Sequence, residues 1–461
     1  MDEQGPILPP PIAFQDPEER SRAPWAWILL GAIFLALILL QNQPNKDVVP
    51  GSKLDAADLS SELKMALISK EAPKLLGSEK RTDQTGAGDD LLKKILVEVE
   101  PDKAKDPLAA KYVLAVGHEL GKPADPVALK TLQTSKVRND QVFAEVYGGK
   151  TLPDGWVASH EDQLPKNFLG KVVASHAGKP GESRPAIGQS DLVALLLFMF
   201  MAVVILLGGL GVIGTFIAMT SSGKIRPIGT PLGPISKQSA DRLALRMCLF
   251  FVAFSLVPSI VATTIRGKFA LGVASLIGDL VFLGVFIWMN TIPVFGVADP
   301  VRKLFGRTKP VGKLIAFGIA AFAANLPITA FAAVITAALF KGGPKPTHPL
   351  SEQLGLGASP VTVLVFFLLA CVSAPVLEEL SFRGMLFPGL ARYMKPWMAM
   401  LLSGFLFASI HPQGPMLWAA LGSIGAVSAC LTYYTGSLLP SMVMHAIHNC
   451  AIMTLAVVFL M

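Results

Sequence analysis

Long apolar segments recur from Leu192 to the C-terminus, and they restrict the fold of this chain more than any other feature. Hydrophobic residues make up 52% of the 461 residues, and charged residues make up only 16%. This composition is too apolar for an ordinary soluble protein, and most of the runs are long enough to cross a bilayer as helices. The sequence therefore predicts an all-α, multi-pass membrane protein embedded in a lipid bilayer.

The multi-span membrane domain is expected to occupy residues 191–461. Its apolar runs predict a bundle of about eight transmembrane helices. We place these spans at Leu192–Met219, Leu243–Ile265, Phe269–Phe295, Leu314–Phe340, Val361–Leu390, Pro396–His411, Met416–Tyr434 and Leu438–Met461.

The N-terminal part of the chain predicts a tail followed by an anchor. Residues 1–24 are polar and proline-rich, which is typical of a flexible tail. Residues 25–40 read WAWILLGAIFLALILL, an apolar run with tryptophans at one edge, and predict a transmembrane anchor helix. A signal peptide is the competing interpretation, but no small-residue cleavage site follows in QNQPNKDVVP.

Residues 41–190 have the composition of a soluble domain. Short amphipathic patterns recur there and predict a small, mostly helical domain. The fragments DPLAAKYVL and DPVALKTLQ hint weakly at a helical repeat. His118, His160 and His176 lie in this region without the spacing of metal ligands, which favours surface or packing roles.

The distribution of charge predicts an orientation. The chain has 40 Lys and Arg against 33 Asp and Glu, and the basic surplus belongs to the membrane domain. The two loops richest in basic residues, 221–242 and 297–313, fall on one side, which is expected to be cytoplasmic. Residues 41–190 then lie on the non-cytoplasmic side of the cell (inner) membrane. The surplus is explained by this bias, and no nucleic-acid partner is expected.

Three charged residues interrupt the apolar stretch APVLEELSFRGMLF, where each charge is costly. On a helix, Glu379 and Arg383 stand at i and i+4 in the order that favours an ion pair. Glu378 projects about 100° away. A partly desolvated carboxylate in that place suits a general base that takes a proton from water. The alternative is a purely structural charge network.

Two further pairs of polar or aromatic residues follow within the apolar runs. His411 comes four residues after Phe407 in FASIH, and Asn449 comes four residues after His445 in HAIHN. Each pair therefore shares a helix face. Neutral imidazoles bind metals or position water, and an asparagine amide donates to a developing oxyanion.

The patterns E-E-x-x-x-R, F-x-x-x-H and H-x-x-x-N occur in this order as EELSFR, FASIH and HAIHN. Together they resemble the motifs of the CAAX-protease and bacteriocin-processing family, over about residues 361–461. The resemblance implies a protease-like helical core and an intramembrane endopeptidase, a hydrolase acting on a membrane-associated protein or peptide. The family name points to prenylated C-terminal tripeptides, although no pattern in this chain encodes a preference for a prenyl lipid.

The resemblance also implies roles for individual residues. Glu378 matches the position that activates water, with His411 and His445 assisting it, and Asn449 matches the oxyanion-stabilising position. Glu379 and Arg383 match the rest of the first motif and support the site.

Both metalloprotease and metal-independent glutamate-protease mechanisms are described for the family. Zinc or another divalent metal would take Glu378, His411 and His445 as ligands, but no H-E-x-x-H signature is present. Both mechanisms remain open at this point.

The expected spans place the candidate residues at different depths, with Glu378 near the middle, His445 toward the cytoplasmic side and His411 at the outer end of a short helix. A non-catalytic scaffold or transporter is the rival interpretation. Asp279, Asn325 and the helix-breaking Pro258 would then line a polar path. No convincing inverted repeat supports a transporter.

Overall fold

The computed structural model is helical throughout its described residues, and no strand occurs among them. It divides into two compact units. Unit 1 comprises Met1–Gln43, Val204–Pro346 and Val365–Cys450, and unit 2 comprises Pro44–Val203, Thr347–Leu364 and Ala451–Met461. The described residues are 23–41, 54–75, 85–149, 151–178, 185–264, 309–339, 358–411 and 414–460, with the isolated positions 277, 278, 280, 284 and 354.

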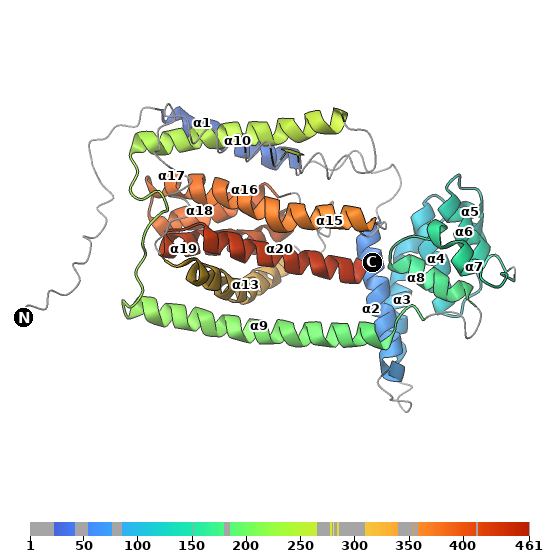
Figure 1. Ribbon diagram of the computed structural model, residues 1–461. Helices are drawn as coiled ribbons and strands as arrows, with labels where there is room; N and C mark the ends of the chain where they lie inside the picture. The colour runs from blue at the N-terminus through green and yellow to red at the C-terminus, as the bar shows by residue number, and fades with distance from the viewer. Residues whose placement is uncertain are drawn as a thin grey trace, which may run out of the picture. The chain divides into compact units, whose positions relative to one another are not determined.

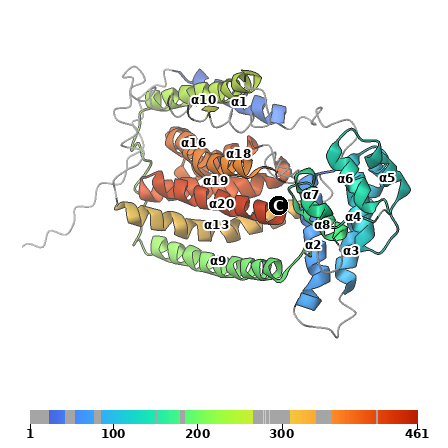
Figure 2. The same cartoon turned by 45° about the vertical axis from the view of Figure 1, so that its right-hand side comes forward.

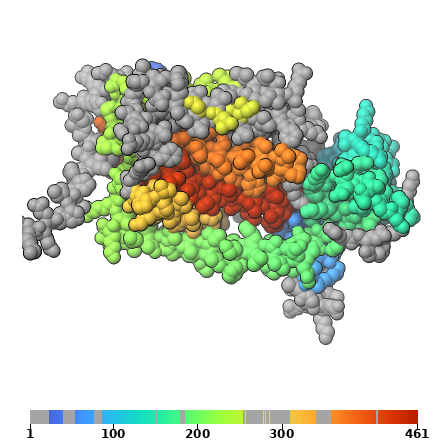
Figure 3. Space-filling model, in the orientation of Figure 1, coloured from blue at the N-terminus to red at the C-terminus, as the bar shows by residue number. Residues whose placement is uncertain are grey.

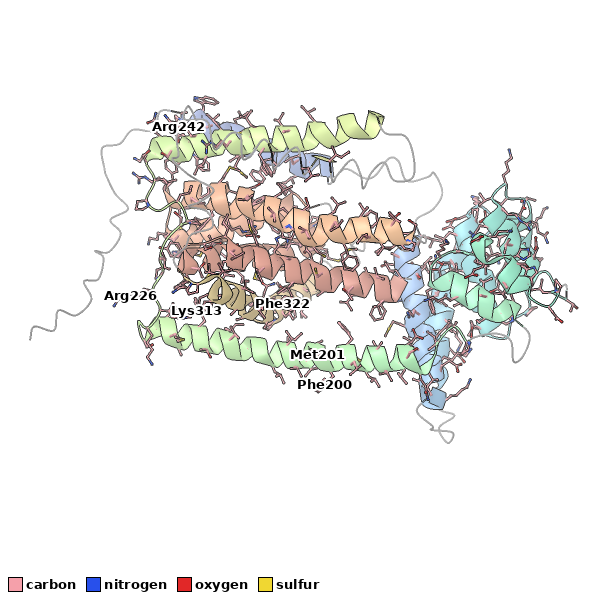
Figure 4. All side chains as sticks on the ribbon, viewed as in Figure 1. Phe200, Met201, Arg226, Arg242, Lys313 and Phe322 are labelled. Atoms are coloured by element: carbon pink, nitrogen blue, oxygen red, sulfur yellow. The ribbon has the colours of Figure 1, made fainter. Side chains whose placement is uncertain are left out.

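Within these ranges, five helical segments are long and apolar enough to cross a membrane (Figure 1). They are Gln189–Ser221 (α9), Val311–Leu339 (α13), Pro360–Ala391, Pro415–Thr435 and Leu439–Leu460 (α20). Phe200 and Met201 of α9 are 64% and 51% exposed, as expected for side chains that face lipid (Figure 4). The prediction of a multi-pass membrane protein is thus confirmed.

The number of eight spans stays a prediction. The expected span Leu243–Ile265 corresponds to helix α10, Lys237–Thr264, whose first turns carry charge. The expected span Pro396–His411 corresponds to the shorter apolar helix α18, Pro396–Ser409. The expected span Phe269–Phe295 lies almost entirely outside the described residues, as does the predicted tail.

The segment Pro360–Ala391 runs as one helix with two widened turns. Regular α-helix is present at Pro360–Leu368 (α15), Ala374–Ser381 (α16) and Phe387–Ala391 (α17). Single π-helical turns at Leu369–Ser373 and Phe382–Leu386 separate these pieces. Such turns insert an extra residue per turn and often occur at functional sites. The two acidic residues of the first motif lie in α16, and Arg383 lies in the second π turn.

Small residues bring α18 into close contact with helix α19, Trp418–Thr435. A short helical turn, Pro415–Leu417, comes directly before α19. A Cβ atom on Gly425 would lie only 2.6 Å from the Cα of Gly404 and 3.0 Å from a guanidinium nitrogen of Arg383. This pair of glycines lets the two backbones approach, as in other membrane helix pairs. The orange and red atoms of the chain after residue 360 are in direct contact in the space-filling view (Figure 3).

The N-terminal apolar run forms helix α1, Trp25–Gln41, close to the predicted limits of 25–40. It lies beside α10 in both ribbon views (Figures 1 and 2). Its buried residues Ala26, Leu30 and Phe34 follow the i, i+4 spacing and join the core of unit 1. Whether α1 spans the membrane as an anchor stays a prediction; one face of it packs into the core, whereas Ile28 and Leu39 are 75% and 59% exposed.

The polar region of unit 2 is built from seven helices around one hydrophobic core. These are Ala56–Leu75 (α2), Thr85–Val99 (α3), Pro107–Glu119 (α4), Pro126–Gln133 (α5), Arg138–Tyr147 (α6), Trp156–Ser159 (α7) and Phe168–Ala177 (α8). The two fragments that hint at a repeat are helix starts of one type: Asp106 and Asp125 each cap a helix whose first residue is proline.

A chain of hydrogen bonds links four of these helices. The hydroxyl of Tyr147 lies 2.7 Å from Nδ1 of His176, whose Nε2 lies 2.8 Å from Oε1 of Glu119. Lys70 donates to the Glu119 backbone carbonyl, and its Nζ lies 3.4 Å from Oε2 of that residue. The ring of His118 lies 4.0 Å from that of His176, centroid to centroid. Sequence spacing did not predict that these two histidines meet.

Basic side chains gather at one end of unit 1. Arg226, Arg242 and Lys313 belong to the loop after α9, to α10 and to α13, and all three lie at the same end of the bundle (Figure 4). This arrangement agrees with the prediction that the two basic loops share one side. The cytoplasmic assignment of that side stays a prediction.

Candidate active site

Glu379 is a fully buried carboxylate held by two cationic or hydrogen-bonding partners. Its Oε1 lies 3.2 Å from Nη1 of Arg383, which is also fully buried. The same oxygen lies 3.1 Å from Nδ1 of His445. The i, i+4 spacing on the helix therefore produces the ion pair expected from the sequence, although the π turn at Phe382–Leu386 begins between the two residues. A buried charge of this kind persists only with such compensation.

His445 lies between the two glutamates. While its Nδ1 faces Glu379, its Nε2 lies 3.6 Å from Oε2 of Glu378. The imidazole is 4% exposed, so its orientation is fixed by its surroundings. A carboxylate that accepts from Nδ1–H selects the tautomer in which Nε2 carries a lone pair. Nε2 and Oε2 of Glu378 then face each other as two acceptors, and at 3.6 Å they share no hydrogen bond. The order of groups is thus Arg383, Glu379, His445 and Glu378.

Glu378 differs from its neighbour in exposure. Its side chain is 28% exposed, whereas that of Glu379 is fully buried. The two residues are adjacent in α16 and project about 100° apart. Glu379 is therefore packed entirely inside the bundle, whereas the Glu378 side chain is partly exposed, although its Oε2 atom, which faces His445, is itself buried.

His411 follows the end of α18 and is fixed by local contacts. Its Nδ1 lies 2.6 Å from the carbonyl oxygen of Phe407. Since a carbonyl only accepts, Nδ1 carries the proton and Nε2 of the neutral ring is left as an acceptor. The Phe407 ring lies 4.5 Å from the His411 ring and 5.8 Å from the His445 ring, centroid to centroid. Phe407 also stacks under the Arg383 guanidinium at 4.7 Å.

Asn449 is engaged with the helix that carries the glutamates. Its Nδ2 donates to the carbonyl of Ala370 at 2.7 Å, within the first π turn. An amide nitrogen has two hydrogens, so this bond leaves one N–H for another acceptor. The contact ties α20 to the segment that precedes α16.

The expectation that the candidate residues lie at different depths is wrong for Glu378 and His445, which are in contact. For His411 the expected depth stays a prediction. It follows α18, which has 14 residues and reaches only about 21 Å, short of the roughly 30 Å hydrocarbon core. The contacts of His411 are with Phe407, one turn earlier in the chain.

The metal ligands Glu378, His411 and His445 stay a prediction. No group of three His, Cys, Asp or Glu side chains in the described part of the chain is placed to hold a metal ion. Nδ1 of His445 is engaged by Glu379 and Nδ1 of His411 by Phe407, so Nε2 is the nitrogen that either ring would offer to a metal.

The residues invoked for a transport path have packing roles where they are described. Asn325 is buried in α13 and donates to Thr329, whose hydroxyl lies 3.0 Å from that of Ser423 in α19. This is a helix–helix hydrogen bond of the kind that joins membrane helices. Asp279 and the side chain of Pro258 lie outside the described residues.

Residues 360–451 match a family model described as type II CAAX prenyl endopeptidase Rce1-like. No curated protein and no solved structure matches the chain. The matched range contains α16, His411, His445 and Asn449, and thus all three motifs identified in the sequence. The resemblance to the CAAX-protease and bacteriocin-processing family is therefore confirmed for the segment 360–451, as a match to the Rce1-like type II CAAX prenyl endopeptidases.

Proposed function

We propose that this protein is an intramembrane endopeptidase that hydrolyses a peptide bond of a membrane-associated protein or peptide. One observation carries the proposal: the His445 imidazole is held between the carboxylate of Glu379 and that of Glu378, whose buried Oε2 has no hydrogen-bond partner among the described residues. A purely structural charge network would not need a second glutamate with an unpaired oxygen at the other ring nitrogen. The family match over 360–451 supports the same reaction class.

In the proposed reaction, Glu378 takes a proton from a water molecule. The resulting hydroxide attacks the carbonyl carbon of the substrate and forms a tetrahedral intermediate. The bond from that carbon to nitrogen then breaks, and the proton held by Glu378 passes to the leaving nitrogen. Water must reach this depth, and Oε2 of Glu378, which has no hydrogen-bond partner in the part of the chain that the structure describes, is the acceptor that it is proposed to meet.

The other site residues act on the geometry and charge of this step. Glu379 and Arg383 hold His445 so that its Nε2 faces Glu378 and the attacking water. His411, with its proton on Nδ1, presents Nε2 as an acceptor that orients water. The remaining N–H of Asn449 is proposed to donate to the oxyanion of the intermediate.

We place the protein in the cell (inner) membrane, with its 41–190 region on the non-cytoplasmic side. The basic end shared by Arg226, Arg242 and Lys313 supports this orientation (Figure 4). The substrate is then met within the bilayer or at its surface.

The test uses purified full-length protein and three probes: a farnesylated peptide ending in a C-a-a-X sequence, its unprenylated counterpart and a library of transmembrane peptides. Wild type is compared with Glu378→Gln and His411→Ala, each with and without a chelator. Glu98→Gln is the matched control, because Glu98 is an exposed glutamate of the polar region.

Cleavage that both site substitutions abolish and Glu98→Gln retains supports the endopeptidase. Cleavage that survives Glu378→Gln overturns the proposed role of that residue. A folded wild type that cleaves none of the probes favours the scaffold or transporter. Loss of activity with a chelator returns a divalent metal to the mechanism, and preference for the farnesylated probe identifies a prenylated substrate.

A further inference from the structure

Helix α1 lies far outside the family match. It packs into the same core as Ala374–Ala391, the segment that carries Glu378, Glu379 and Arg383 and is called the reactive segment here. Its buried face is formed by Ala26, Leu30 and Phe34. The hydrophobic cluster that contains them also holds Met247 and Phe251 of α10, and Phe382, Met385, Leu386 and Phe387 of the reactive segment. The second π turn therefore rests on a surface that residues far from it in sequence provide.

A single buried carboxylate fixes the start of α1. Asp241 of α10 is 1% exposed, and it accepts from the backbone N–H of Ala23 at 3.1 Å and from Nε1 of Trp27 at 3.2 Å. It also accepts from the hydroxyl of Tyr393 at 2.7 Å, just beyond α17. The rings of Trp27 and Tyr393 meet edge to face at 5.7 Å. Asp241 thus joins α1, α10 and the end of the reactive segment.

Aromatic rings continue this contact to the histidines. Phe34 lies 5.0 Å from Phe251 and 6.2 Å from Phe382, centroid to centroid. Phe382 in turn lies 5.3 Å from Phe407, which packs against Arg383, His411 and His445. Such edge-to-face pairs have defined geometry, so a shift at one end is felt by the next ring.

We propose that α1, secured by Asp241, is a positioning element of the reactive site. Asp241 and Phe34 hold the π turn Phe382–Leu386 in place, and this turn sets the position of Arg383 beside Glu379. Asp241 is a positioning residue in this proposal, since it reaches the reacting groups only through other side chains. The inference rests on the proposed peptidase function and extends it to residues outside the family match.

The test compares Asp241→Ala, Asp241→Asn and Phe34→Ala with wild type. Leu35→Ala is the matched control, because Leu35 is the next residue of α1 and is 57% exposed. With the farnesylated C-a-a-X peptide, Asp241→Ala and Phe34→Ala are expected to lower kcat by about tenfold to 100-fold. KM is expected to change by less than about twofold, since substrate contacts are unaltered. Asp241→Asn keeps one carbonyl acceptor and should restore part of kcat.

Hydrogen exchange of the segment 382–391 gives a second readout that needs no activity. Exchange there is expected to be faster in Asp241→Ala and Phe34→Ala than in wild type and in Leu35→Ala. If wild type cleaves no probe but exchange responds in this way, the positioning contact holds and only the peptidase function fails. Unchanged exchange overturns the inference. Wild-type kcat in a folded Asp241→Ala protein, or equal effects of Leu35→Ala and Phe34→Ala, also overturns it.

Discussion

Nδ1 of His445 lies 3.1 Å from Oε1 of Glu379, and the two residues are 66 positions apart in the chain. This contact joins the first and third motifs and orients the imidazole toward Glu378. It also places the negative charge of Glu379 between a histidine and an arginine, so that no single partner bears the cost of burial alone.

Glu379→Gln is expected to reduce kcat by roughly 10²- to 10⁴-fold, because an amide no longer selects the tautomer of His445. KM should change little, since Glu379 is buried and does not meet substrate. Steady-state cleavage of the farnesylated peptide measures both constants. A kcat equal to that of the Glu98→Gln control contradicts the role of Glu379 in orienting the histidine.

Arg383→Met is expected to destabilise the protein by about 3–5 kcal/mol, since it leaves a buried carboxylate without its cation. The double variant with Glu379→Gln should lose less than the sum of the two single changes. Thermal unfolding of the four proteins in one detergent gives the coupling between the two residues. Additive losses would show that the ion pair contributes little in this site.

Gly425→Ala tests the close approach of α18 and α19. The added Cβ would lie 2.6 Å from the Cα of Gly404, so the helices must separate and Arg383 must shift. Both stability and kcat are expected to fall. Gly422→Ala is the control, because its Cβ would meet its nearest neighbour at 3.6 Å, an ordinary contact. Similar behaviour of the two variants would show that the helices have room at Gly425.

The polar region of unit 2 should lose stability in acid. Burial and the neighbouring His176 lower the pKa of His118. Burial by itself would raise the pKa of Glu119, but its bonds to His176 and Lys70 outweigh burial and lower that pKa. Both groups therefore bind protons more readily when unfolded. The stability that these two groups contribute is fully present above the unfolded pKa of His118, about 6.5. The His118 contribution is lost as the pH falls below that value, and the Glu119 contribution is lost as the pH falls below the unfolded pKa of a glutamate, about 4.

This pH dependence can be measured by hydrogen exchange of segments 107–119 and 168–177 in the full chain, corrected for the intrinsic effect of pH. His118→Gln should remove the loss that begins as the pH falls below about 6.5, and Glu119→Gln should weaken the loss at lower pH. Lys70 lies beside Glu119 and also pairs with Asp89 at 3.7 Å. His160→Gln is the control, because the His160 ring stacks on Trp156. An unchanged slope in both site variants would contradict the assignment.

Local patterns in the sequence were sufficient for the class of protein and for one ion pair of the candidate site. Apolar runs that are long enough to cross a bilayer predict membrane helices, because the thickness of the bilayer sets the length of a span. The ion pair of Glu379 with Arg383 follows from helix periodicity, and the two Asp-Pro starts follow from capping. Three short motifs in order were enough to indicate the family.

Only the tertiary structure decided which distant groups meet. The sequence did not show that His445 faces both glutamates, that Phe407 stacks under Arg383, or that His118 lies against His176. It also did not show that Asp241 and Phe34 join α1 to the reactive segment. Spacing along one helix fixes only which residues share a face. Contacts between helices depend on their crossing, depth and rotation, which small residues such as Gly404 and the widened π turns set together.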